Sequence, residues 1–233
     1  ISITSDEKVL ALLTVPKEVL ESDKNFIFCA TQNGLVKKTP IVEYSNIRNS
    51  GKIGIVLKDN DSLIKAQVTD GSNYILLVTH QGKSIKFKEA DVNPTGRASQ
   101  GVKGISLKKD DAVIAASTFE INPVRPDDKR KKFFREILVV TEHGLGKRTD
   151  VDEYPEQGRG GQGVKVAELS DKTGNLAAAR LITEADEQAV ITTKAAQVIK
   201  LPIKNIKVLG RSTQGVILMR PAKGDVVTSV TTL

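Results

Sequence analysis

The sequence is poor in the residues that build disulfides, zinc sites and base-stacking platforms. It contains one cysteine, two histidines, no tryptophan and 4% aromatic residues. A single thiol, Cys29, excludes an internal disulfide framework and a cysteine-based zinc site. So few aromatic rings leave little material for stacking single-stranded bases or enclosing sugars.

Long apolar segments are lacking as well. No stretch approaches the eighteen or so uncharged apolar residues that a membrane-spanning helix requires. The first residues, Ile1 to Asp6, lack the basic and apolar regions of a secretory signal peptide. We therefore expect a cytosolic protein without a membrane span.

The charge balance is basic. Lysine and arginine total 35 and aspartate and glutamate total 28, which gives a formal net charge of +7 over 233 residues. A hydrophobic content of 39% suits a folded chain with a real core rather than a disordered one. The surplus of positive charge suits a polyanionic partner. Because aromatic residues are scarce, a nucleic-acid ligand is more consistent with a duplex held by its phosphates.

One sequence frame recurs four times along the chain. An apolar strand ends at Thr, a small residue follows three positions later, and a basic residue follows seven positions after the Thr. The copies are Thr31, Gly34 and Lys38; Thr79, Gly82 and Lys86; Thr141, Gly144 and Arg148; and Thr193, Ala196 and Lys200. The frame predicts a β-hairpin, because glycine accepts the positive φ of a tight turn.

A second glycine keeps the same register. It follows the frame Thr by 20 residues in the first copy and by 22 in the others, at Gly51, Gly101, Gly163 and Gly215. The frame Thr residues are 48, 62 and 52 positions apart, which predicts units of about 50 residues with four short strands each. No segment holds a helical apolar period over three turns. Repeats of this kind predict an all-β, propeller-like arrangement of blades around an axis.

The repeats suggest boundaries. We expect four complete blades, over residues 25–70, 71–119, 136–184 and 185–233. Residues 1–24 are expected to supply the closing strand of a preceding partial blade, through the segment 6–14. Residues 120–135 form a proline-containing basic insertion, which is either an arm that reaches for phosphate or a solvated loop.

Several segments resemble the C-terminal domain of the bacterial DNA gyrase A subunit. They are residues 30–39, 142–149, 151–155 and 210–218. The resemblance implies a β-pinwheel, whose blades exchange a strand with a neighbour and whose basic rim wraps duplex DNA. It also implies partners, namely the gyrase B subunit together with the rest of the A subunit, in an assembly of two copies of each at the bacterial nucleoid. ATP and Mg would bind elsewhere in that enzyme, so no cofactor is expected here, and the isolated domain would be monomeric.

One loop is similar to the gyrase box of that family. It comprises Gln157, Gly158, Arg159, Gly160, Gly161, Gln162 and Gly163, with Gly158 and Gln162 in place of two family cations. It lies in the third complete unit, so it is interpreted as a secondary box, and the principal box is expected before Ile1. A dinucleotide fingerprint also fits the glycine spacing, but no helix pattern follows. The loop is interpreted as a turn that brings main-chain N–H groups close to DNA, or else as a structural glycine turn.

The repeating cations are the candidate DNA contacts. We expect them to lie along one continuous outer track, because random surface charge has no reason to follow the repeat. The candidates are Lys37, Lys38, Arg48, Lys52, Lys86, Arg97, Lys103, Lys147, Arg148, Arg159, Lys165, Lys200 and Arg211.

Catalytic candidates are few. Tyr44 and Tyr154 occupy a slot that holds Val92 and Ile206 in the other units, which indicates packing rather than a nucleophile. Two histidines without cysteine partners predict no metal site. Three alternatives to a gyrase wrapping domain stay open. They are a propeller scaffold that binds proteins, the equivalent domain of the topoisomerase IV C subunit, and an independent enzyme. No set of catalytic residues in the sequence supports the last of these.

Overall fold

The structure is a computed structural model that describes residues 9–46, 51–121 and 135–233. Helix is a minor component, as predicted. It is confined to the four-residue α1 (Lys17–Leu20) and to short 3-10 turns at η1 (Ile41–Tyr44), η2 (Glu89–Asp91), η3 (Val151–Glu153) and η4 (Ile203–Asn205). Among the described residues, no helix has the length and hydrophobicity to cross a membrane.

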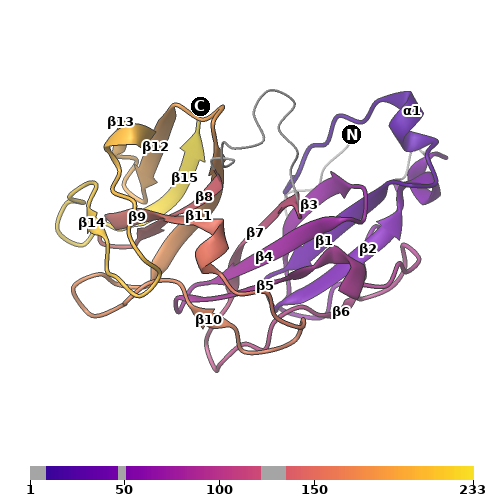
Figure 1. The fold of residues 1–233 in the computed structure, drawn as a ribbon, viewed down its shortest axis with the longest axis horizontal. Coiled ribbons are helices and arrows are strands. Elements are labelled where there is room, and N and C mark those ends of the chain that lie inside the picture. Colours follow the sequence, from indigo (N-terminus) through magenta and orange to yellow (C-terminus); the bar gives the residue numbers. More distant parts are fainter. Residues whose placement is uncertain (1–8, 47–50, 122–134) are drawn as a thin grey trace.

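In the described part of the chain, fifteen strands form four antiparallel sheets that follow one another in chain order, from the first sheet on the right of Figure 1 to the last on the left. The strands of the first two repeats are β1 (Phe26–Thr31), β2 (Leu35–Pro40), β3 (Leu63–Thr69), β4 (Asn73–Thr79), β5 (Lys83–Lys88), β6 (Val102–Lys103) and β7 (Val113–Glu120). Those of the last two are β8 (Arg135–Thr141), β9 (Leu145–Asp150), β10 (Val164–Lys165), β11 (Leu176–Thr183), β12 (Gln188–Thr193), β13 (Val198–Pro202), β14 (Val216–Ile217) and β15 (Val227–Thr232).

The frame hairpin is confirmed in every repeat. Each frame Thr ends one strand, and the next strand starts after a tight turn. Gly34, Gly82 and Gly144 have φ values of 82°, 77° and 80°, and Ala196 adopts 62° in the fourth copy. The exchanged strand packs over the first three turns, where a Cβ at Gly144 would lie 2.4 Å from the Met219 carbonyl oxygen. No strand covers the fourth turn among the described residues, so an alanine methyl is accommodated there.

The blades exchange a strand, as the resemblance implied. The sheet orders are β3-β1-β2-β6, β10-β5-β4-β7, β11-β8-β9-β14 and β13-β12-β15. Each two-residue outer strand therefore comes from the following repeat, for example with Val164 opposite Ser84 and Lys165 opposite Lys83. A blade thus has three strands of its own and a fourth from its neighbour. Within the described residues the last sheet has three strands, and β13 is an open edge.

Three apolar clusters fill the spaces between successive sheets. They are built around Phe28 and Phe87, around Tyr154 and Val139, and around Leu138 and Ile191. The slot shared by Val92, Tyr154 and Ile206 is a core position, because all three side chains are about 1% exposed. Cys29 is buried in β1, and burial raises the pKa of its thiol to about 11.

One predicted strand is wrong. Residues 9–14 form no strand, and Val9 and Leu12 are 67% and 87% exposed. The other predicted residues, 6–8, lie outside the described part. A strand needs a neighbour to satisfy its backbone groups, and no described sheet edge pairs with this segment.

Most of the basic insertion, residues 122–134, also lies outside the described part. Its two ends meet, because Arg135 Nη1 donates a hydrogen bond to the Glu120 carbonyl at 2.6 Å. The insertion therefore leaves and re-enters the fold at one place, between β7 and β8. The blade boundaries given above stay a prediction.

Candidate nucleic-acid interface

The basic residues of the frame do not form the exposed track that their spacing predicted. The four frame cations and the lysines that precede two of them make six candidates. Five of these are between 0% and 8% exposed: Lys37, Lys38, Lys86, Lys147 and Arg148. Only Lys200, on the open-edged β13, is exposed. The expectation of an outward-facing track is wrong for the five buried residues, because their charges are used between blades.

Three of the buried cations join one blade to the next. Each side chain donates a hydrogen bond to a carbonyl of the 3-10 turn in the following repeat, or of the residue just after that turn. The pairs are Lys38 with Glu89 at 3.2 Å, Lys86 with Val151 at 3.0 Å, and Arg148 with Ile206 at 2.8 Å. We call these three contacts the inter-blade latches.

Each latch has a second partner, five residues before the frame Thr. Lys38 Nζ lies 4.9 Å from the ring centroid of Phe26, and Lys86 Nζ lies 5.1 Å from that of Tyr74. In the third blade the partner is a carboxylate, with Arg148 Nη1 2.6 Å from Glu136 Oε2. An aromatic face and a carboxylate both stabilise a buried cation. Burial still lowers the pKa of Lys38 and of Lys86.

The remaining two buried lysines hold surface loops in place through hydrogen bonds to loop carbonyls. Lys147 Nζ donates to the carbonyls of Gly210 and Arg211 at 2.6 Å each and to Thr213 Oγ1 at 3.1 Å. Lys37 Nζ donates to the carbonyls of Gly54 and Arg97. Burial lowers the pKa of Lys147 to about 8. The ammonium groups thus fix the backbone of the loops that carry Arg97 and Arg211.

The depressed pKa of Lys147 predicts a pH dependence. Between pH 8 and the ordinary lysine value of about 10.4, the unfolded chain holds more protons than the folded one, so this group's contribution to stability rises with pH. The free energy of unfolding of the wild type, minus that of Lys147→Met, should increase by about 1–2 kcal/mol over this range after allowance for solvent screening. Urea unfolding near pH 7 and near pH 10 measures it. The exposed Lys172→Met is the matched control, and an equally flat difference for both variants would contradict the prediction.

The arginines of the loops reach across the same junctions on the outside. Arg159 Nη1 donates to the Lys103 carbonyl at 3.1 Å, and Arg211 Nη1 donates to the Lys165 carbonyl at 2.8 Å. Arg97 makes the equivalent contact with Ile53 at 2.9 Å. Each acceptor lies two residues after the second glycine of the preceding repeat. Arg159 and Arg211 are thereby placed beside Lys103 and Lys165, and Arg97 is placed beside Ile53.

These paired cations are the ones that face outward. Lys103 and Lys165 are exposed and lie on β6 and β10, the outermost strands of the first two sheets. Arg159 is exposed, and Arg97 and Arg211 are half-buried. We call Lys103, Arg159, Lys165 and Arg211 the rim cations. Of the other candidates, Lys52 is half-buried and donates to the Glu43 carbonyl at 3.3 Å, and Arg48 lies outside the described residues.

The box-like loop is attached to the exchanged strand of the preceding repeat. The Gly160 N–H donates to the Gly104 carbonyl at 2.7 Å, and the Ser106 hydroxyl donates to the Gly160 carbonyl at 2.7 Å. Ile85 takes the place of Lys37 and Lys147 beneath this loop, since a Cβ on Gly161 would lie 3.6 Å from its Cδ1. The box-like loop therefore has an apolar support where two other loops have an ammonium group.

These loops share a sequence pattern that is separate from the frame. The pattern Gly-Arg-X-X-Gln-Gly spans residues 96–101, 158–163 and 210–215, so the box-like loop is one member of a series. Its arginine is the one that crosses the junction in each case. The pattern therefore marks the arginines that cross the junctions on the exposed side. The frame cations of the first three repeats cross the same junctions in the buried interior.

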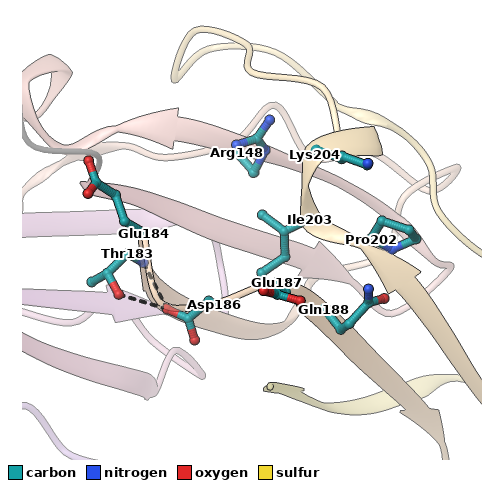
Figure 2. A pocket seen from close by; sticks show the side chains of 9 residues that line it. All are labelled: Arg148, Thr183, Glu184, Asp186, Glu187, Gln188, Pro202, Ile203 and Lys204. Carbon is teal, nitrogen blue, oxygen red and sulfur yellow. Dashed lines mark hydrogen bonds between the residues drawn. The ribbon is translucent and has the colours of Figure 1, made fainter.

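A cavity of about 700 Å³ opens where the third and fourth blades meet (Figure 2). Glu184, Asp186 and Glu187 line it opposite Arg148 and Lys204. Asp186 Oδ2 accepts from the Thr183 N–H at 2.8 Å, which fixes the β11–β12 turn. Carboxylates repel phosphate, so this cavity does not extend the rim. Among the described residues, no group of three or more His, Cys, Asp or Glu side chains could hold a metal ion.

Comparisons with known proteins agree with this architecture. A family model described as the DNA gyrase C-terminal domain, beta-propeller, matches residues 25–70, 73–120, 135–183 and 187–233. The DNA gyrase A subunit of Staphylococcus epidermidis (strain ATCC 12228 / FDA PCI 1200) is 36% identical over 230 residues, which are 99% of this chain and 24% of that protein. The chain thus spans about a quarter of the length of the curated relatives it matches.

Two solved structures share the fold. The crystal structure of the C-terminal domain of DNA topoisomerase IV superposes with a TM-score of 0.86 at 25% identity, over 99% of this chain and 68% of that one. A DNA gyrase A C-terminal domain superposes with a TM-score of 0.74 at 23% identity, over 91% of this chain and 67% of that one. The second likeness is one of fold alone.

Proposed function

Because the chain belongs to the DNA gyrase C-terminal domain family and has its β-pinwheel fold, we propose that it binds duplex DNA along the outermost strands and bends it around the disc. The observation that carries this proposal is the pairing of rim cations across successive junctions. Lys103 stands beside Arg159, and Lys165 stands beside Arg211. Cations that recur at successive junctions can neutralise successive phosphates of a bent duplex.

The two rim lysines are exposed and can reach phosphate. The main salt bridge of the group joins Lys165 Nζ to Glu168 Oε2 at 2.5 Å, with both side chains nearly half exposed. An exposed ion pair contributes little to stability, so Lys165 can exchange its carboxylate for a phosphate at small cost. Contacts of this kind carry no sequence information, and the binding is therefore non-specific.

The role of the domain in a larger enzyme is part of the same proposal. The chain acts as the non-catalytic wrapping domain of gyrase A, and its partners are the gyrase B subunit together with the rest of gyrase A. By presenting a wrapped segment, it directs ATP-dependent strand passage toward negative supercoils at the bacterial nucleoid. The gyrase A relatives, which are 36% identical over nearly the whole chain, favour this assignment.

The salt dependence of DNA binding tests the rim. Each lysine that neutralises a B-DNA phosphate adds about −0.9 to the slope of log K against log salt. The double variant Lys103→Gln, Lys165→Gln should therefore reduce the slope by about 2 units. Lys17→Gln, Lys24→Gln is the matched control, because both lysines are exposed, precede the first blade and remove the same charge.

Two results would overturn the proposal. A shallow or absent slope for the wild type would favour the alternative of a protein-binding scaffold. An equal loss of slope in both double variants would mean that DNA responds to net charge rather than to the rim.

The superposition with topoisomerase IV supports a second candidate, in which the chain is the equivalent domain of that enzyme. Such a domain has fewer or degenerate boxes, and the box-like loop here has two family cations replaced. Ligation of a nicked circle with the bound domain separates the two. Trapped writhe favours a gyrase-type wrap, and ligation products with unchanged linking number favour the topoisomerase IV assignment.

A further inference from the structure

The innermost strands of the blades line an open cavity that the rim does not use. β3, β7, β11 and β15 lie at the edges of their sheets, on the side away from the exchanged strands where the sheet has one. β7 contacts both β3 and β11, and β11 contacts β15. A cavity of about 320 Å³ opens along the first three of these strands.

Two cations from different blades converge on this cavity. Lys65 comes from β3 and Arg180 from β11, with β7 between the two strands. The polar side chains of Gln67, Ser117 and Thr118 also line the cavity. No aspartate or glutamate is among the described residues that line it. The lining therefore supplies positive charge and hydrogen-bond groups without a neutralising carboxylate.

The two charges act on each other. The pKa of Lys65 is lowered by burial and then by the Arg180 charge. The Lys65 ammonium group makes no hydrogen bond to any described residue, and Arg180 Nε donates to Thr232 Oγ1 at 3.2 Å. Asp186 interacts electrostatically with Arg180, but it belongs to the β11–β12 turn and does not line the cavity. Lys65 is half-buried and Arg180 is exposed, so an anion placed between them would be stabilised by both charges.

We propose that the cavity along β3, β7 and β11, which we call the axial cavity, is a binding site for an oxyanion of the phosphate class. The anion would be held between Lys65 and Arg180. The cavity is much smaller than a turn of duplex, so a free inorganic anion fits it and the DNA backbone does not. Lys65 offers a point charge with three donors, and Arg180 offers a planar fork that matches two oxygens of one anion. The site depends on neither the rim nor the box-like loop.

Calorimetric titration with inorganic pyrophosphate at constant ionic strength tests the site. The wild type should bind saturably, and Lys65→Gln and Arg180→Gln should each weaken binding about tenfold. Lys108→Gln removes the same charge from an exposed turn and should leave the affinity unchanged. Without pyrophosphate, Lys65→Gln should melt no lower than the wild type, because the substitution relieves a repulsion and breaks no hydrogen bond.

Three results would overturn the proposal. The first is absence of saturable pyrophosphate binding by the wild type, and the second is a loss of affinity in Lys108→Gln equal to that in the two cavity variants. The third is that a short duplex displaces pyrophosphate from the wild type but no longer does so from the double variant Lys103→Gln, Lys165→Gln. The last result would assign the anion to the DNA path. Failure of DNA binding at the rim with retained pyrophosphate binding would leave the axial site intact, so the two proposals fail separately.

Discussion

Replacing Arg148 by Met should destabilise the protein by about 3–5 kcal/mol, since the change leaves the buried Glu136 without its cation. Glu136 is 8% exposed, and Arg148 Nη1 lies 2.6 Å from its Oε2. The hydrogen bond from Arg148 Nε to the Ile206 carbonyl is lost as well, so the third blade loses a contact with the fourth. Urea unfolding at neutral pH measures the loss.

Lys200→Met is the matched control. Lys200 occupies the same frame position in the fourth repeat, but it is exposed on β13, so its replacement should change stability by less than about 0.5 kcal/mol. Comparable losses of stability in the two variants would mean that the frame cation stabilises the protein only through its charge. The proposed role of Arg148 as an inter-blade latch would then be wrong.

The first blade offers a rescue of the latch. Because Phe26 and Lys38 take the places of Glu136 and Arg148, the double variant Glu136→Phe, Arg148→Lys should recover most of the stability that Glu136→Phe alone or Arg148→Lys alone loses. A coupling energy of about 1 kcal/mol or more is expected for residues in direct contact. Additive losses would contradict the idea that the two pairs are alternative solutions.

The loss in Arg148→Met should also depend on pH. Burial already raises the pKa of Glu136, and Arg148 opposes that rise. Without Arg148 the folded-state pKa rises further above the unfolded value, so the variant takes up a proton on folding. The stability difference from wild type should therefore shrink as the pH falls toward the ordinary glutamate value of about 4.3 and grow as the pH rises.

The repeat predicted the hairpins and the turn glycines, because backbone sterics require a residue that accepts a positive φ in such turns. It could not separate a cation that faces DNA from a cation that joins two blades. Both roles recur once per unit, so regular spacing is equally consistent with a buried contact. The informative signal is the residue five positions before the frame Thr, which is Phe or Tyr where the buried cation is Lys and Glu where it is Arg.

The exchanged strands were implied by the resemblance and not by the local pattern. β6, β10 and β14 are two residues long and have no apolar alternation of their own. Their pairing is determined by the strand of the preceding blade and by a glycine that permits close approach. The pairing of rim cations between units has the same origin, since Arg159 meets Lys103 only because β6 belongs to the first sheet and the box-like loop lies against it.

Gly163→Ala should be among the most destabilising single changes in the chain, by about 3 kcal/mol or more. A Cβ at this position would lie 2.2 Å from the Ser84 carbonyl oxygen, on the backbone of β5, and φ is 71°. Since backbone cannot move aside as a flexible side chain would, β10 must separate from β5. The contact of the box-like loop with the second blade would then be lost along with the placement of Lys165 on the rim.

Gly51→Ala measures the part of that effect that comes from the positive φ alone. Gly51 has a φ of 72°, which strains an alanine to nearly the same extent, but no atom of the described residues lies within 4 Å of the Cβ position. We expect a loss of about 1 kcal/mol from the left-handed conformation alone. Urea unfolding of the two variants gives the excess for Gly163→Ala, and the salt slope of DNA binding should fall in that variant even under conditions where both variants are fully folded. Equal losses at the two glycines would mean that the positive φ, and not the approach of neighbouring blades, explains why glycine occupies these positions.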